Sequence, residues 1–404
     1  MKLLFITSRF PFPPFIGGRP IPFHRMRILS RKHEITLLSL YERDQELNGI
    51  EQLSRFCSSI HTVKLPKWKS FINMALLGPV SRLPLQVLYY QSGEFRECLN
   101  KLLACEKFDL IHAFMLRLAP FCRNISTPII MDLIDSMQLN FERSVDMARP
   151  PQKWLLREEL RRLTYFEKEI CSQFARLIVV SNEDKKYLSS ENVNVVPIGI
   201  DTELFVPGKA QVYNPTIIFS GNMLYGPNIQ AVKWFTENCF FRIQKEISNV
   251  SFVIAGNAPP LNIRKLGNNT GISVPGFVDS MPDALIKASL AVAPMQSGSG
   301  MQFKILEAMS CGLPVVTNTL GLGDIKAKDE VEILLAETPD DFVDKIVKIL
   351  DNDKLARQIG NRAREFVINN HNWEDTTNIV EGIYNQVLDR AKVRTAEREQ
   401  RVDE

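Results

Sequence analysis

The stretch PMQSGSGMQFKILEAMSCGLPVV, residues 294–316, decides the fold of this chain. A short apolar run leads into a loop of small residues, Ser297 to Gly300. We expect a helix to open at about Met301 and to stop at Gly312, because glycine is favoured just beyond the end of a helix. An apolar strand at 314–317 follows at once. This order of strand, loop, helix and strand is the repeating unit of a parallel α/β sheet.

Two side chains of the expected helix could bind a nucleotide. Lys304 and Glu307 are three residues apart, so they share one helix face near its N-terminus. The N–H groups of a first helical turn attract an anion, and with Lys304 they could hold a diphosphate. The carboxylate of Glu307 could accept hydrogen bonds from two ribose hydroxyls. A surface Lys–Glu pair on an ordinary helix is the alternative.

The whole chain alternates between short apolar runs and longer amphipathic segments, which predicts βαβ units. Its 404 residues exceed what one hydrophobic core usually supports. We therefore expect an α/β protein with two Rossmann-like domains, residues 1–200 and 201–371, whose parallel sheets face a central cleft. The irregular segment 195–207 would link them. A helix at about 372–390 would pack back on the first domain, and 391–404 would form a charged tail.

Loops of the first half also carry candidate residues. Gly17 and Gly18 precede a helix, where glycine lets main-chain N–H groups approach a phosphate, although a flexible turn is the alternative. His112 ends an apolar run and could orient a sugar hydroxyl or accept a proton. A histidine bonded to the backbone is the alternative there. Asp135 could contact donor or acceptor hydroxyls, or cap the next helix.

Composition narrows the class of protein. A net charge of +3 argues against a dedicated nucleic-acid binder. The seven cysteines are odd in number and contain no Cys-x-x-Cys pair, which argues against a disulfide framework and a zinc site. We find no signal peptide and no apolar run long enough to span a membrane, so we expect a cytoplasmic protein. The basic and apolar stretch at 64–77 suits a peripheral contact with the inner membrane face, or a helix packed on its domain with an exposed basic edge.

Several of these motifs together resemble a known family. The run from Lys304 to Val316 looks like the donor-site helix of GT-B glycosyltransferases of the retaining family-4 type. The segment VPIGID at 196–201 resembles that family's interdomain segment. The run GNMLYGPN at 221–228 is similar to sugar transferases of exopolysaccharide clusters. Further segments fit the family pattern, namely Gly17-Gly18, Asp109 to His112, Val180-Ser181 and Gly276-Phe277-Val278.

The resemblance implies a metal-independent hexosyltransferase without a cofactor. It implies transfer, with retention, from a UDP-sugar or GDP-sugar to a saccharide or lipid-linked acceptor in polysaccharide or glycoconjugate assembly. It implies catalytic roles for His112, Asp135 and Lys304. The implied donor-binding residues are Gly17, Gly18, Gly221, Asn222, Asn228, Phe277, Ser299, Gly300, Met301, Gln302, Lys304 and Glu307.

The chain departs from the family pattern at two places. Ser299 stands where the family has the first of two glutamates, and Asn222 and Asn228 stand where it has two cations. Lys304 and the helix N–H groups would then supply the positive potential, with Arg9 or Arg19 as further candidates. Two other functions stay open: a sugar-nucleotide epimerase of similar fold, and a non-catalytic module that binds nucleotide sugars. A dinucleotide oxidoreductase is disfavoured because no Gly-x-Gly-x-x-Gly follows the first strand.

Overall fold

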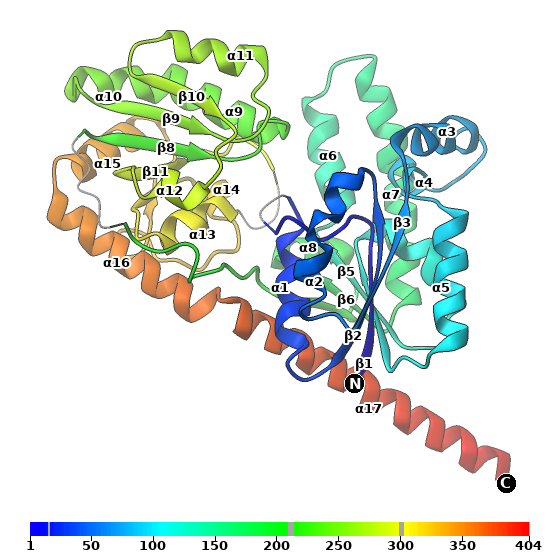
Figure 1. The fold of residues 1–404 in the computed structure, drawn as a ribbon. Helices are drawn as coiled ribbons and strands as arrows, with labels where there is room; N and C mark the ends of the chain where they lie inside the picture. The colour runs from blue at the N-terminus through cyan, green and yellow to red at the C-terminus, as the bar shows by residue number, and fades with distance from the viewer. Residues whose placement is uncertain (15–16, 209–213, 299–302, 404) are drawn as a thin grey trace. The chain divides into compact units, whose positions relative to one another are not determined.

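The chain forms two compact α/β units in the computed structural model, which describes residues 1–14, 17–208, 214–298 and 303–403 (Figure 1). Unit 1 consists of Met1–Pro197 together with Trp373–Glu404, and unit 2 of Ile198–Asn372. The chain therefore leaves unit 1 near the expected linker and returns to it with its last helix.

Unit 1 contains a seven-stranded parallel sheet with the order β3-β2-β1-β4-β5-β6-β7. The strands are β1 Lys2–Thr7, β2 Glu34–Tyr41, β3 Ser59–Lys64, β4 Leu110–Phe114, β5 Ile129–Ile134, β6 Arg176–Val179 and β7 Val193–Val195. Helices cover both faces of such a sheet, so its inner strands read as almost unbroken apolar runs. This is why the sequence predicts most of them.

The connections of unit 1 are mostly helical. They are α1 Pro20–Leu29, η1 Asp44–Gly49, α2 Ile50–Leu53, α3 Lys67–Leu77, α4 Leu85–Tyr89, α5 Gly93–Cys105, η2 Leu116–Cys122, α6 Met137–Met147, α7 Gln152–Gln173 and α8 Asn182–Leu188. The last helix, α17 Trp373–Asp403, packs beside α1 (Figure 1). The segment expected as a separate charged tail thus continues the backbone of α17.

Unit 2 contains a six-stranded parallel sheet with the order β10-β9-β8-β11-β12-β13. Its strands are β8 Thr216–Ser220, β9 Ser251–Ala255, β10 Ile272–Gly276, β11 Leu290–Ala293, β12 Val315–Thr317 and β13 Leu334–Leu335. Its helical segments are α9 Gly226–Phe235, η3 Thr236–Phe240, α10 Phe241–Glu246, α11 Leu261–Arg264, η4 Lys265–Asn268, α12 Met281–Leu285, α13 Phe303–Ser310, α14 Thr319–Leu322, α15 Pro339–Leu350 and α16 Asp353–Asn370. The expected fold class, two α/β domains with parallel sheets, is confirmed.

Each sheet grows outward in two directions from its first strand. In unit 1 the chain builds β2 and β3 outward on one side of β1 and then crosses to β4 on the other side of β1. In unit 2 it builds β9 and β10 on one side of β8 and then crosses to β11 on the other. Ligands of open α/β sheets bind beyond the carboxyl ends of the strands at this switch point. The loops after β1 and β4, and those after β8 and β11, are therefore the first places to search for a site.

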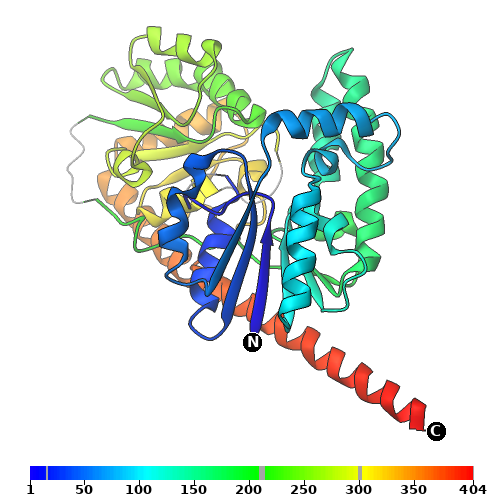
Figure 2. The same ribbon diagram turned by 45° about the vertical axis from the view of Figure 1, so that its right-hand side comes forward.

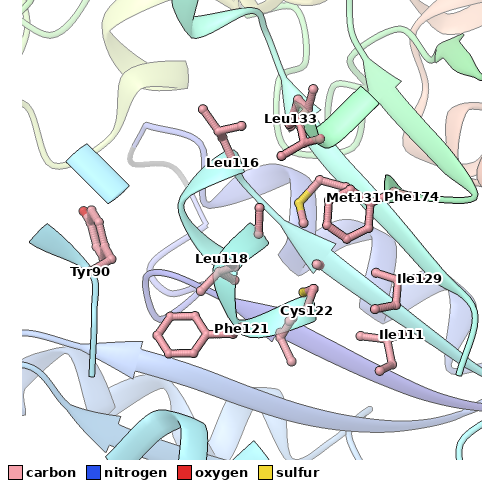
Figure 3. Packing of buried hydrophobic residues seen from close by; sticks show 14 of the residues in the cluster. Tyr90, Ile111, Leu116, Leu118, Phe121, Cys122, Ile129, Met131, Leu133 and Phe174 are labelled. Atoms are coloured by element: carbon pink, nitrogen blue, oxygen red, sulfur yellow. The ribbon is translucent and has the colours of Figure 1, made fainter. Parts of the chain in front are cut away.

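The core of unit 1 has two layers, one on each face of its sheet. Leu4 and Ile6 belong to one buried cluster, whereas Leu3 and Phe5 belong to the other, as the period-two geometry of a strand requires. Figure 3 shows the first cluster, in which side chains of β5 pack against those of η2. Tyr90 stands at the border of this cluster, where it becomes part of a polar site.

Candidate functional site

The predicted donor helix, α13, begins at Phe303 beyond the carboxyl end of β11. Lys304 lies in its first turn and is half-buried. The Lys304 Nζ donates a hydrogen bond to Asn228 Oδ1 at 2.8 Å and lies 5.4 Å from the centre of the Phe219 ring. Burial lowers the pKa of Lys304 to about 7, and the charge of Glu307 opposes this shift. A bound anion would restore the protonated form, so Lys304 is suited to a diphosphate.

Glu307 lies one helical turn after Lys304 and is also half-buried. Burial raises the pKa of Glu307 to about 7, against the attraction of Lys304. Within the described part of the chain, no hydrogen bond to the Glu307 carboxylate is found. A half-buried carboxylate with free acceptor capacity suits a ligand that offers two hydroxyl groups.

The two asparagines predicted at the donor site do not replace the missing cations directly. Asn228 is 4% exposed, and its Nδ2 donates to the Asn222 main-chain oxygen at 2.9 Å while its Oδ1 accepts from Lys304. Asn222 Oδ1 in turn accepts a hydrogen bond from the Leu224 N–H at 3.0 Å. A Cβ at Gly221 would lie 2.7 Å from Asn228 Nδ2, so glycine makes room for this amide. Asn228 therefore positions the Lys304 ammonium group between the loops after β8 and β11.

Side-chain hydrogen bonds fix the loop after β11 to two neighbouring segments. Ser297 Oγ donates to Gln230 Oε1 at 2.6 Å, and Asn318 Nδ2 donates to the Met295 main-chain oxygen at 2.6 Å. Gly298 has φ +111°, a conformation that favours glycine. The four predicted donor residues Ser299, Gly300, Met301 and Gln302 lie outside the described residues.

Phe277 follows β10 at the same carboxyl edge of the sheet, and 56% of its surface is exposed. An exposed aromatic ring at a strand end is available to stack on a flat ligand group such as a nucleobase. Unit 2 thus brings together Gly221, Asn222, Asn228, Lys304 and Glu307 at one edge of its sheet, with Phe277 farther along that edge.

The predicted glycine pair lies in unit 1, directly before the first turn of α1. Gly17 has φ +57°, which favours glycine. A Cβ at Gly18 would lie 3.2 Å from Ile134 Cδ1, so the backbone passes close to the end of β5. The backbone at Gly18 therefore lies close to the end of β5, and the approach of these glycines to a phosphate stays a prediction.

The expectation for His112 needs correction. His112 is the third residue of β4 rather than its end, and its ring is fully buried, stacked on Phe5 at 4.7 Å. Its Nδ1 is hydrogen-bonded to Tyr384 Oη of α17 at 2.5 Å, and its Nε2 lies 3.4 Å from Asp132 Oδ2. A ring without exposed surface cannot touch an acceptor, so the predicted catalytic role of His112 is wrong for this geometry. Its contacts are structural.

Asp135 follows β5 at the carboxyl edge of unit 1 and is partly exposed. Its Oδ2 accepts a hydrogen bond from Asn140 Nδ2 at 2.9 Å. Burial raises the pKa of Asp135, and the bond from Asn140 and the charge of Arg117 oppose this shift. The preceding Ile134 has φ +69°, which is strained for a β-branched residue. Asp135 remains a candidate for contact with a hydroxyl group.

A polar pocket at the carboxyl edge of the unit 1 sheet was not predicted from the sequence. The cavity of about 190 Å³ is lined by residues that include Ser8, Arg9, Lys67 and Tyr90. Ser8 and Arg9 come from the loop after β1, Lys67 is the first residue of α3, and Tyr90 follows α4. Arg9 and Arg19 were named from the sequence as possible cations, and Lys67 belongs to the basic stretch at 64–77, but their meeting in one pocket was not predicted, because no fixed spacing connects such distant positions.

Part of the sequence matches a known protein family, and two relatives match most of its length. Residues 214–352 match the family described as glycosyl transferases group 1. A protein of the Klebsiella pneumoniae cps region, described as uncharacterised, is 22% identical over 92% of this chain and 96% of its own length. The Escherichia coli UDP-Gal:alpha-D-GlcNAc-diphosphoundecaprenol alpha-1,3-galactosyltransferase is 24% identical over 71% of this chain and 77% of its own length.

Solved structures show the same fold. A sucrose-phosphate synthase of Thermosynechococcus elongatus superposes with a TM-score of 0.71 at 16% identity, over 96% of this chain and all of that one. The Anabaena protein HepE, solved in complex with UDP, gives a TM-score of 0.65 at 13% identity over the same shares of the two chains. With two parallel-sheet units, a group 1 domain and glycosyltransferase relatives, this chain is a glycosyltransferase of the GT-B fold.

Proposed function

We propose that the chain transfers a hexose-type sugar, with retention and without a metal ion, from a UDP-sugar or GDP-sugar to a saccharide or lipid-linked acceptor. The observation that carries the donor assignment is the pair Lys304 and Glu307, half-buried at the switch point of the unit 2 sheet. A cation and an unbonded carboxylate one helical turn apart match the diphosphate and the ribose of one nucleotide.

Each residue at this site has a separate task in the proposed reaction. Glu307 accepts the two ribose hydroxyls, Phe277 stacks on the base, and Lys304 faces the diphosphate. When the bond between the sugar carbon and the diphosphate oxygen breaks, negative charge develops on the leaving group. Lys304 and the N–H groups at the helix start stabilise that charge electrostatically.

Polysaccharide assembly is the proposed setting. Support comes from the relative of the cps region and from the Escherichia coli relative, whose name gives a UDP-sugar donor and a diphosphoundecaprenol-linked acceptor. In unit 1 we propose Asp135 for contact with the acceptor hydroxyl, because burial raises its pKa and improves it as a base.

A donor screen tests the enzyme. UDP-sugars and GDP-sugars are incubated with the full chain, with and without a membrane extract that supplies lipid-linked acceptors, and nucleotide release is measured. Release that requires the extract supports transfer, and NMR of the product reports retention or inversion. Turnover to the epimer of the donor without extract would favour the epimerase, and tight binding without turnover would favour a non-catalytic module.

We also propose that α3 touches the membrane that holds the acceptor. Large apolar side chains of α3 are exposed, with Trp68 at 64% and Leu76 at 70%, whereas Ser70 on its inner face is fully buried. Residues 64–93 contain four cations and no Asp or Glu. Lys64, Lys67 and Lys69 are paired with Asp44, Glu42 and Glu94 respectively, so the exposed apolar face carries most of this argument. An apolar helix face of this kind suits the interface of a lipid surface. No helix among the described residues is long and apolar enough to cross a bilayer.

A second exposed cluster supports this contact. The segment RPPQKWLLR, residues 149–157, has three cations and no acid, and Trp154 in it is 68% exposed. In Figure 2, α3 and the turn between α6 and α7 lie at the end of unit 1 toward which the β1 arrow points.

Sedimentation with vesicles tests the contact. The full chain should bind vesicles that contain phosphatidylglycerol and lose that binding when Trp68 and Leu76 are changed to Ser. Leu261→Ser, at a 75% exposed leucine of unit 2, is the control that removes apolar surface elsewhere. Equal losses in both proteins, or no binding by the unmodified chain, would contradict the proposal.

A further inference from the structure

Two arginines of unit 1 converge on one phenol at the switch point of its sheet. Arg9 follows β1, Arg117 lies in η2 after β4, and Tyr90 follows α4. Tyr90 Oη accepts hydrogen bonds from Arg9 Nε at 2.9 Å and from Arg117 Nη1 at 3.3 Å. The Arg117 guanidinium also lies over the Tyr90 ring, 4.9 Å from its centre.

These arginines differ from their neighbour Arg19. Arg19 forms an ion pair with Glu46 at 2.7 Å and donates to the Phe12 main-chain oxygen at 2.7 Å, so its charge is neutralised. Within the described ranges, no carboxylate lies within ion-pair distance of Arg9 or Arg117. The sequence reading treated Arg9 and Arg19 as equivalent candidates, and these contacts separate them.

Arg117 carries unused donor capacity. Its Nε is buried and has no hydrogen-bond partner among the described residues. Burial lowers the pKa of Arg117, and the nearby charge of Arg9 lowers it further. Glu42 and Glu46 act on Arg9, and Asp135 acts on Arg117, at distances beyond an ion pair. The buried, unpaired N–H of Arg117 is costly unless an acceptor such as an anion completes the arrangement.

The polar cavity of unit 1 described above adjoins Tyr90 and could hold such an anion. Its polar lining includes Ser8, Arg9, Arg19, Glu42, Glu46, Tyr90 and Lys67, the first residue of α3. Arg117 is not part of this lining and adjoins it through its bond to Tyr90. The O–H of Tyr90 has no acceptor among the described residues, so it can also donate into the cavity. The pocket therefore offers guanidinium, hydroxyl and ammonium donors next to the helix proposed to lie on the membrane.

We infer that Arg9, Arg117 and Tyr90 form an anion subsite in unit 1 that takes the phosphate or diphosphate group of a phosphorylated acceptor. A phosphoryl group has enough oxygens to accept from both guanidinium groups and from the phenol together. A carboxylate offers only two oxygens in one plane. The inference rests on the proposed transferase function, because it names the class of its acceptor.

Calorimetric titration with inorganic pyrophosphate tests the subsite in the full chain. The double variant Arg9→Met/Arg117→Met should bind this probe about tenfold more weakly than the unmodified chain. The control Arg123→Met/Arg161→Met removes two surface arginines of unit 1 that are paired with Glu169 and Glu158, and it should bind as the unmodified chain does. Tyr90→Phe, which keeps the ring, should give an intermediate affinity.

Two further measurements keep the result interpretable. Thermal melting shows whether the double variant is folded, and Arg9→Lys/Arg117→Lys, which keeps the charges, should recover part of the affinity in a folded protein. Separate titrations with a hexose 1-phosphate and a short-chain prenyl diphosphate distinguish a soluble source of phosphate from a lipid-borne one. Binding of either that depends on Arg9 and Arg117 supports the subsite.

The inference would be overturned by equal affinities in the double variant and the unmodified chain, or by equal losses in both double variants. It would also be overturned if saturating UDP abolished the binding that depends on Arg9 and Arg117, because the arginines would then hold the donor. Failure of the donor screen is a separate outcome. It would refute the transferase function while leaving the pyrophosphate titration valid.

Discussion

At the scale of single residues, the proposed donor site depends on Lys304 and Glu307, and burial disfavours the charged form of both side chains. Burial moves the pKa values of Lys304 and Glu307 toward 7 from opposite directions. Burial thus makes each group easier to neutralise than its free form, and a ligand that stabilises the ionised form would reverse this. Perturbed pKa values of this kind are common in functional sites, and here they accompany a carboxylate with no hydrogen bond.

Glu307→Ala should weaken binding of nucleoside diphosphates by about 1.5–3 kcal/mol, because two ribose hydroxyls lose a buried acceptor. Calorimetry with UDP and GDP measures the change. Glu246→Ala, at an exposed position at the end of α10, is the matched control. Unchanged affinity for both nucleotides would remove Glu307 from the site.

Lys304→Met should lower the turnover rate by about a hundredfold and weaken free nucleoside binding far less, because charge builds up on the diphosphate in the transition state. Lys304→Arg should recover part of the rate. Steady-state kinetics with the donor found by the screen compares the three proteins. A normal rate for Lys304→Met would mean that the charge is supplied elsewhere.

Donor affinity should have a maximum near pH 7. Below it, Glu307 gains a proton and can no longer accept both hydroxyls, and above it Lys304 loses its proton and its charge. Each limb should approach about tenfold per pH unit. The sugar ester of the donor carries no phosphate that titrates in this range. Glu307→Gln should remove the acid limb, and Lys304→Arg should remove the alkaline limb. A flat profile for the unmodified chain would contradict both assignments.

At the scale of elements, the carboxyl edge of the unit 2 sheet is packed backbone against backbone. A Cβ at Gly256, after β9, would lie 1.7 Å from the Gly221 main-chain oxygen, after β8. Gly256 N–H also donates to the Gly276 oxygen at 2.9 Å, and Gly221 N–H to the Ala255 oxygen at 3.0 Å. Glycines thus hold three strand ends together under the donor loops.

Gly256→Ala should therefore destabilise unit 2 by about 1–3 kcal/mol, since the loops after β8 and β9 must separate. Nucleotide affinity should fall with it, because Asn222 belongs to the displaced loop and its main-chain oxygen holds Asn228 of α9. Thermal melting and calorimetry measure the two effects. Gly382→Ala, whose new Cβ would meet nothing within 4 Å on α17, should leave unit 2 unchanged. Equal stability of both variants would refute the packing argument.

The helices and strands could be predicted from the sequence better than the contacts between residues of distant segments. Most strands could be found because a sheet covered on both faces requires apolar runs, and the two-residue β13 was missed because it is too short to show one. A helix with Lys304 and Glu307 was predicted, and α13 confirms it over Phe303–Ser310, whereas its expected start at Met301 lies outside the described residues. The burial of His112 and the meeting of Arg9, Arg117 and Tyr90 could not be predicted, because residues from three or more separate segments create them.

At the scale of the whole molecule, the first and last parts of the chain are tied together by buried polar groups. Arg25 of α1 forms a fully buried ion pair with Asp132 of β5, and Asp132 lies beside His112 of β4. Tyr384 of α17 completes the group through His112 Nδ1. Four elements, one of them from the end of the chain, thus share one network inside unit 1, so a change in α17 should be felt in unit 1 and not in unit 2.

Tyr384→Phe tests this division. It removes one hydroxyl and leaves His112 Nδ1 buried without a partner, which should destabilise unit 1 by about 1–3 kcal/mol. Hydrogen exchange measured by mass spectrometry should then accelerate in β1, β4 and α1, while β8, β9 and β11 keep their rates and UDP affinity stays unchanged. Tyr165→Phe, at a 69% exposed tyrosine of α7 in the same unit, should leave every rate as it is. Faster exchange spread equally over both sheets would show that the chain unfolds as one body, and α17 would then stabilise the whole protein rather than unit 1 alone.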